Sequence, residues 1–246
     1  MMGGQAVRRS GGWLVRCAGA ILGAIALLIA YPPTRLPAQV GYPPDQSPYR
    51  DVKRGQTLIL SGGYLIGDRG VVGVGPSDGP TVGARFQVLM GKDLAFFLAG
   101  TYGRLSRYVA DPTKNAGSQI SGPIKTDVGI VEGGMDVMLS GAKTWHGLAP
   151  YLGGSAGAIF ANNPPVDSSG YEFGVQAIVG GEFGIRWYFG RQLAVRTDFR
   201  WQFWQVKYPL AYKQPAPDGS RILPITADDK EWTDHPWFNL GLSWTF

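Results

Sequence analysis

The sequence predicts an all-β protein, an eight-stranded antiparallel up-and-down transmembrane β-barrel, and three observations support this prediction. Apolar residues alternate with polar or small residues, with a period of two, over eight segments between residues 55 and 246. The connections between these segments alternate between long and short, as they do in transmembrane barrels. Glycine accounts for 37 of the 246 residues, about twice its average frequency, which fits many strands and turns.

Residues 1–38 are expected to be a signal peptide and are set aside from the fold. Arg8, Arg9 and Arg16 give a basic start, and the run from Cys17 to Ala30 is apolar over about fourteen residues. A membrane-spanning helix needs about twenty apolar residues, so this run has the length of a signal-peptide core. Cleavage is expected after Ala38, and the alternative is an uncleaved membrane anchor.

Removing this segment changes what the charge of the chain implies. The segment contains four arginines and no acidic residue, so the formal net charge of +5 falls to near +1. The basic character therefore belongs to the export signal, and the charge gives no reason to expect a nucleic-acid partner. The single cysteine leaves with the same segment, so the mature chain is expected to have neither disulfides nor thiol chemistry.

Residues 39–54 are rich in proline and polar residues, and they are expected to form a periplasmic lead-in to a barrel over residues 55–246. In the first half of the barrel, one strand alternates loosely around Gly62 and Gly63, and the tight turn "GKD" joins the next two strands. The four strands expected in this half are Leu58–Ile66, Val82–Met90, Leu94–Leu105 and Val131–Leu139.

The second half of the barrel shows the clearest alternation. Its second strand alternates for well over ten residues, whereas strands of globular proteins average about five or six. The turn "FGRQ" leads into a strand whose two faces carry large aromatic residues and charged residues, respectively. The strands expected here are Pro150–Phe160, Phe173–Trp187, Leu193–Phe203 and the terminal stretch "NLGLSWTF".

The long connections all fall on one side of this barrel, opposite both chain ends. Loops on a rigid scaffold are where binding function concentrates, so these loops are expected to meet a surface ligand, another protein or lipopolysaccharide. Nothing in their sequences identifies the target. The loops are residues 67–80, 108–126, 161–170 and 207–234.

The direction of the apolar faces decides between a membrane barrel and a soluble, secreted, lipocalin-like barrel, which would turn them inward. Aromatic residues bunch near the strand ends, as expected for the two girdles of a membrane barrel. Lipid cannot satisfy an open sheet edge, so the last strand must pair with the first. The expected girdles are Phe96, Phe97, Tyr151, Trp187, Tyr188, Phe189, Trp244 and Phe246 beside the short turns, and Tyr64, Tyr102, Phe160, Tyr171, Phe173, Phe203, Tyr208 and Phe238 beside the long loops.

The opposite faces place charged side chains inside the barrel, where an eight-stranded lumen is just wide enough for side chains. Opposite charges in so narrow a space should pair, because an unpaired buried charge is costly. The expected result is a polar plug, and the alternative is a narrow channel for small solutes. The expected lumen charge network is Arg85, Glu132, Asp136, Glu182, Arg186, Arg196, Asp198 and Arg200, with Gln87 beside it.

The stretches "PYLGGSAGAIF", "GGEFGIRWYFGRQLAVRTDFRWQFW" and "NLGLSWTF" resemble small eight-stranded outer-membrane β-barrel proteins of Gram-negative bacteria, the OmpA-, OmpX- and OmpW-like groups. The resemblance covers roughly residues 55–246 and is one of pattern. It implies an outer-membrane location, with outer-membrane lipid and lipopolysaccharide as surroundings. It also implies that the assembly machinery of that membrane reads the terminal strand as an insertion signal, at Phe238, Leu240, Leu242, Trp244 and Phe246.

Two further hypotheses concern catalysis and metal binding. His235, beside Asp234, is the candidate base of a lipid A-modifying enzyme, but the serine that such deacylases place two residues later is Trp237 here. The stretch "TADDKEWTDH" has acidic residues and a histidine, but its spacing matches no Ca²⁺ loop. We therefore expect no enzymatic activity, no metal and no cofactor.

Overall fold

The computed structural model describes residues 47–52, 55–162, 167 and 169–246. The predicted signal peptide, with its cleavage site after Ala38, lies outside the described residues, and so does most of the lead-in. No helix within the described ranges is long and apolar enough to span a membrane. The elements are β1 (Tyr49–Asp51), β2 (Gln56–Leu65), β3 (Gly79–Met90), β4 (Leu94–Ala110), β5 (Ile120–Met138), β6 (Lys143–Trp145), β7 (Leu148–Ala161), β8 (Val175–Tyr188), β9 (Leu193–Lys207), the 3₁₀ helix η1 (Leu210–Lys213) and β10 (Lys230–Thr245).

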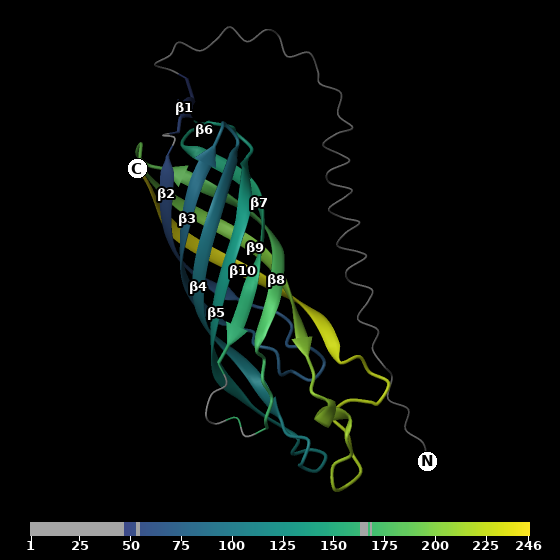
Figure 1. Cartoon of the computed structure of the whole chain (residues 1–246). Coiled ribbons are helices and arrows are strands. Elements are labelled where there is room, and N and C mark those ends of the chain that lie inside the picture. Colours follow the sequence, from purple (N-terminus) through teal and green to yellow (C-terminus); the bar gives the residue numbers. More distant parts are fainter. Residues whose placement is uncertain (1–46, 53–54, 163–166, 168) are drawn as a thin grey trace, which may run out of the picture. The chain divides into compact units, whose positions relative to one another are not determined.

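Eight long strands close into an antiparallel barrel (Figure 1). They follow one another around the wall in the order β2, β3, β4, β5, β7, β8, β9 and β10. The barrel closes where β10 pairs with β2, in a register that runs from Trp237 opposite Leu65 to Thr245 opposite Thr57. The predicted eight-stranded barrel is confirmed, and the terminal strand is part of its wall.

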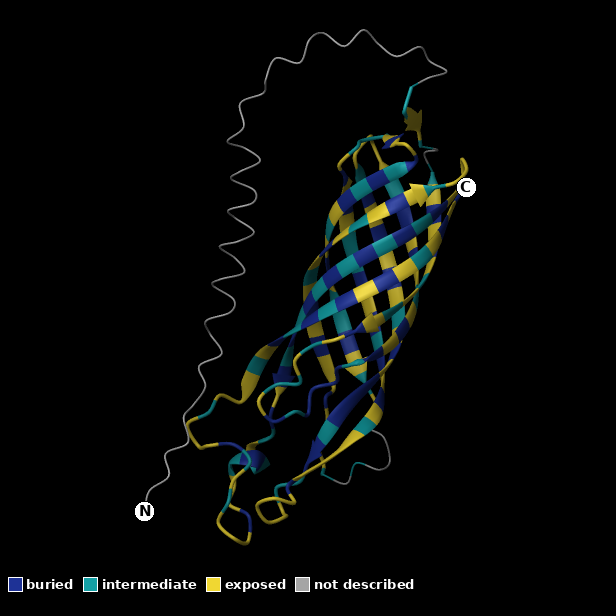
Figure 2. Ribbon diagram, turned by 180° about the vertical axis from the view of Figure 1, so that it is seen from behind, coloured by how far each residue is buried: buried dark blue, intermediate teal, exposed yellow. Residues whose placement is uncertain are grey.

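The side chains of each strand alternate between the outside and the lumen, as Figure 2 shows by burial. The outward positions are apolar and exposed, for example Leu98 at 62% and Leu240 at 56% exposure. A water-soluble barrel would bury these faces, whereas a membrane barrel turns them toward lipid. The lipocalin-like alternative, with its apolar rows inside, is therefore wrong.

Two short strands lie outside the barrel wall, and the sequence did not predict them. β1 pairs with β6, with Tyr49 opposite Trp145 and Asp51 opposite Lys143. Both lie at the end of the barrel that carries the short turns and the C-terminus (Figure 1). Part of the expected lead-in is thus ordered as a strand, because three residues can add to a hairpin edge without any apolar alternation of their own.

Two of the loops are shorter than expected because the strands continue past the apolar band. β4 reaches Ala110 and β5 begins at Ile120, so the loop predicted over residues 108–126 spans 111–119. β10 begins at Lys230, which shortens the loop predicted over 207–234 to 208–229. Strands that stand above the lipid need no apolar outer face, so hairpin pairing continues where the alternation of the sequence stops. A register shift between Arg107 and Val109 also breaks the pattern there.

Candidate functional site

The candidate site is the layer of charge inside the barrel. The eight residues expected there all point inward and are buried, and they comprise four arginines and four carboxylates. They come from four strands, β3, β5, β8 and β9. Period-two alternation places them inside, because the outward neighbours of each are apolar or small.

Glu182 is the hub of this network. Its carboxylate accepts hydrogen bonds from Arg85 Nη1 at 2.6 Å and Arg85 Nη2 at 2.7 Å, a bidentate pair. Arg196 Nη2 lies 3.0 Å from Glu182 Oε1, and Arg200 Nε lies 2.9 Å from Oε2. Three guanidinium groups therefore surround one carboxylate. The other carboxylates of the network must balance the positive charge that Glu182 leaves over.

Asp136 and Asp198 supply part of that balance. Asp136 Oδ2 lies 3.1 Å from Arg186 Nη2 and 3.2 Å from Arg196 Nη1. Arg196 Nε donates to Asp198 Oδ1 at 2.6 Å. The Gln87 amide bridges the same groups: its Nε2 donates to Asp136 at 2.9 Å, and its Oε1 accepts from Arg186 at 2.6 Å.

Glu132 completes the layer on the side of the long loops. It pairs with Arg200 and accepts a hydrogen bond from the Ser155 hydroxyl at 3.0 Å. Gln202 Nε2 reaches both Ser155 and Glu132. The network thus crosses the lumen from β3 to β9 without a break.

Aromatic rings cover the guanidinium groups from inside the barrel. Arg85 lies 3.8 Å from the centroid of Phe97, and Arg196 lies 4.3 Å from that of Tyr151. Arg200 lies 4.5 Å from the ring of Trp237. Phe97 and Tyr151 were expected in the membrane girdle, and this is wrong, because both occupy inward positions where they stack on arginines.

Glycines in the wall give the network its space. A methyl group at Gly153 would lie 2.4 Å from Asp136 Oδ1 and 3.0 Å from Glu182 Cγ. At Gly184 it would lie 2.2 Å from the Tyr151 hydroxyl. Two voids border the charged layer, of about 20 and about 10 Å³, each comparable to a water molecule or less.

The loop side of the lumen has the opposite chemistry, which the sequence did not predict. Inward residues of the strands pack there against residues of the long loops to form an apolar cap. Trp204 lies at the centre of this cap and is 0% exposed. The cap comprises Leu65, Val72, Val74, Leu105, Ala110, Val128, Ile130, Ile159, Tyr171, Phe173, Ile178, Trp204, Val206, Tyr208, Tyr212, Leu223 and Trp237.

The cap explains three errors in the expected outer girdle. Tyr171, Phe173 and Tyr208 are buried in it rather than exposed to lipid. Phe173 also precedes β8, because Gly174 adopts a positive φ of 64° and the strand begins at Val175. Such glycines let a chain turn sharply between a loop and a strand.

One ion pair lies at the edge of the cap. Arg107 of β4 pairs with Asp167, and both side chains are buried. Burial raises the pKa of Asp167, but hydrogen bonds from Ser169 and the Arg107 guanidinium outweigh this and hold the pKa below its usual value. Burial also raises the pKa of Tyr171 and Tyr212 above the usual value for tyrosine.

The candidate catalytic histidine lies in the same region. His235 is fully buried and stacks on Trp204, with 3.3 Å between ring centroids, and its Nε2 lies 2.8 Å from Thr233 Oγ1. Among the described residues no group of three His, Cys, Asp or Glu side chains is placed to hold a metal ion.

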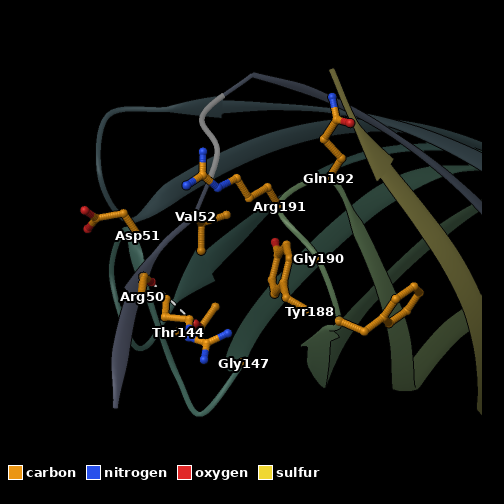
Figure 3. A pocket seen from close by; sticks show the side chains of 10 residues that line it. Arg50, Asp51, Val52, Thr144, Gly147, Tyr188, Gly190, Arg191 and Gln192 are labelled. Carbon is orange, nitrogen blue, oxygen red and sulfur yellow. Dashed lines mark hydrogen bonds between the residues drawn. The ribbon is translucent and has the colours of Figure 1, made fainter. Parts of the chain in front are cut away.

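A cavity opens at the end of the barrel that lies opposite the apolar cap. At the end with the short turns, a cavity of about 1040 Å³ is lined by residues of β1, the β6 ribbon and the β8–β9 turn (Figure 3). Val52 and Tyr188 line both this cavity and the 20 Å³ void beneath it. Tyr188 was expected in the membrane girdle, and this is wrong, because it lies on the inward face of β8 with Arg186. Arg186 also lines that void, so the void borders the charged layer. The expected insertion-signal residues are all exposed on the outer face of the terminal strand: Phe238, Leu240, Leu242, Trp244 and Phe246.

Comparisons with known proteins point to the same architecture. No protein-family model matches the chain, and no curated protein matches it. Among solved structures, Neisserial surface protein A aligns with a TM-score of 0.52 at 11% identity, over 78% of this chain and 97% of that one. The outer membrane protein OprG from Pseudomonas aeruginosa aligns with a TM-score of 0.48 at 13% identity, over 80% and 98% of the two chains. The likeness to Neisserial surface protein A and the closed eight-stranded sheet show that the chain has the fold of small outer-membrane barrels.

Proposed function

We propose that this protein is a closed outer-membrane barrel that conducts no solute, catalyses no reaction, and acts through envelope structure or surface interaction at its long-loop end. The observation that carries the proposal is the double seal of the lumen. A charged layer and an apolar cap lie in series along the same axis. A conduit would need both to open.

The charge balance of the polar layer supports a structural role. Four arginines face four carboxylates, and the ion pairs link all eight. A selective ion pathway normally shows rings of one sign of charge. A balanced network instead fixes the side chains that fill the barrel.

The position of His235 argues against the enzyme hypothesis. A general base must reach the proton that it abstracts, within about 3 Å or through one water. His235 instead stacks face to face on Trp204 inside the cap, and its nearest hydroxyl partner is Thr233 on its own strand. A lipid substrate at the outer surface would have no access to it.

The apolar outer face and the exposed terminal strand support insertion into the outer membrane with the loops outside. On this proposal the assembly machinery is a partner during biogenesis, and lipopolysaccharide surrounds the mature barrel. The Pro- and Gly-rich connections between the strands are then the surface that another molecule meets.

Planar-bilayer recording tests the proposal. Purified protein is first checked for insertion by heat-modifiable gel migration, and single-channel current is then measured in 1 M KCl. We expect insertion without steps of current. Reproducible unitary steps from the wild-type protein would replace this proposal with the narrow-channel alternative, and failure to insert would contradict the membrane assignment itself.

A further inference from the structure

The outer face of β9 and β10 carries two lysines without a counter-charge at the loop end. Lys207 ends β9 and Lys230 begins β10, and the two residues are directly opposite each other in the antiparallel register. Both are exposed. Like charges at directly opposed positions destabilise a strand pair, so this arrangement needs a physical reason.

The neighbouring acidic residues do not neutralise the two lysines. Within the described part of the chain, neither lysine forms an ion pair, and the exposed Asp228 forms none with them. The other nearby carboxylates are engaged elsewhere. Glu231 accepts from the Tyr208 hydroxyl at 2.6 Å and the Val71 amide at 2.9 Å, Asp229 pairs with Lys213 at 2.6 Å, and Asp234 accepts from Trp201 Nε1 at 3.3 Å.

The height of the lysines places them at the level of lipid headgroups. A strand tilted by about 40° rises about 2.6 Å along the barrel axis per residue. Lys230 therefore stands about 36 Å from the level of Trp244 at the opposite rim, whereas the apolar band of such barrels is about 25 Å tall. The lysines lie beyond the hydrocarbon, where the phosphates of outer-leaflet lipids lie.

The residues between the lysines and the hydrocarbon are suited to a sugar and to acyl chains. Trp232 is 56% exposed on the outer face and lies opposite Gln205, directly below the lysine pair. Farther down β9, the ring of Trp201 lies 6.4 Å from that of Phe199 and 6.2 Å from that of Phe203, forming an outward aromatic column. An indole face packs well against apolar faces, and an amide donates and accepts hydrogen bonds.

We propose that Lys207, Lys230 and Trp232 bind the phosphorylated diglucosamine headgroup of lipopolysaccharide. The ammonium groups hold a headgroup phosphate, Trp232 packs on the sugar, and an acyl chain lies along the aromatic column. This site rests on the proposed outer-membrane location. A glycerophospholipid offers the phosphate without the sugar, so the presence of Trp232 and Gln205 beside the lysines favours lipopolysaccharide.

The binding test uses the whole mature barrel in phosphatidylcholine nanodiscs, titrated with bisphosphorylated lipid A and read by native mass spectrometry. Each lysine near a charged lipid surface contributes about fivefold in affinity, so K207Q/K230Q should bind lipid A roughly 25-fold more weakly than wild type. The matched control is K125Q. Lys125 is also exposed, but on β5 it lies opposite Ser106 rather than a second cation, and its removal should leave binding unchanged.

Three outcomes would overturn the site: equal binding by K207Q/K230Q and wild type, an equal loss in K125Q, or equal binding of dephosphorylated lipid A or phosphatidylglycerol. A stability measurement separates binding from folding. In a neutral detergent, K207Q should unfold at a higher temperature than wild type, because two like charges no longer stand at directly opposed positions. With lipid A bound, wild type should unfold at a higher temperature than K207Q. If K207Q still unfolds at the higher temperature in the presence of lipid A, the proposal is contradicted. A wild-type barrel that does not insert at all contradicts the membrane assignment instead.

Discussion

Arg85 and Glu182 join opposite walls of the barrel through two hydrogen bonds of 2.6 and 2.7 Å. Their strands, β3 and β8, are four strands apart in either direction around the closed sheet. The pair therefore spans the lumen rather than linking neighbours. A contact of this kind holds the barrel to one cross-section, because widening the lumen would separate two buried charges.

Neutralising Glu182 should strongly destabilise the barrel. Glu182→Gln leaves three guanidinium groups without their shared carboxylate, and breaking a buried ion pair costs about 3–5 kcal/mol. Urea unfolding in detergent micelles, followed by tryptophan fluorescence, measures the loss. Glu172→Gln, which changes an exposed acid, is the control and should fall within about 0.5 kcal/mol of wild type. Equal midpoints for the two variants would show that the network does not stabilise the barrel.

The two seals of the lumen should act in series. Arg85→Ser/Glu182→Ser opens part of the charged layer but leaves Trp204 and its neighbours in place. We expect no single-channel current from this variant, and none from Trp204→Ala, in which the charged layer persists. Current should appear only when the three substitutions are combined, provided that heat-modifiable migration shows the barrel to be folded. Conductance in either partial variant would mean that one layer alone closes the lumen.

The sequence was sufficient to predict the barrel and the direction of its charged residues, because both follow from period-two alternation. Once Arg186 is placed on a strand whose neighbours Ile185 and Trp187 face lipid, its side chain must point inward. Which carboxylate each arginine meets depends on the register of all eight strands. No local pattern in the sequence carries that information.

The apolar cap left only a faint signal in the sequence. In "FRWQFWQV" both faces of the strand become apolar, since Phe203 points outward and Trp204 inward. That change marks a buried inner surface, but it does not say what covers it. The covering residues come from loops far apart in the chain, such as Val72 and Tyr212, and their contacts depend on the tertiary fold.

Acid should loosen the cap before it opens the barrel. The pKa of Asp167 is held below its usual value in the folded protein, so its ionised form stabilises the fold. That contribution is fully present above the unfolded pKa of about 3.9 and is lost as the pH falls through the lower folded value. Tryptophan fluorescence should therefore stay constant from pH 7 to about pH 4 and change below it.

Asp167→Asn is the matching variant. It removes the ion pair with Arg107 at every pH, so its cap should already be looser at pH 7 and should lose this acid transition. An unchanged transition in the variant would assign the acid response to other carboxylates. Asp218→Asn is the control: its pKa is also lowered, by hydrogen bonds from Ser220 and Ala116, but it lies exposed outside the cap.

Deleting Phe246 should impair assembly more than stability. The residue is exposed at the end of the barrel wall, its ring centroid lies 5.3 Å from that of Trp244, and its amide donates to the Gln56 carbonyl at 2.9 Å. Its deletion therefore removes one ring contact and one hydrogen bond. If the assembly machinery reads the terminal aromatic, the deletion should lower the amount of inserted protein in outer-membrane fractions by about tenfold, while the refolded barrel shifts by less than about 1 kcal/mol. Phe189→Ala removes another exposed aromatic from the same rim, outside the terminal strand, and should insert normally. Normal insertion of the truncated chain would contradict the signal hypothesis, whereas equal defects in both variants would assign the effect to the loss of any rim aromatic.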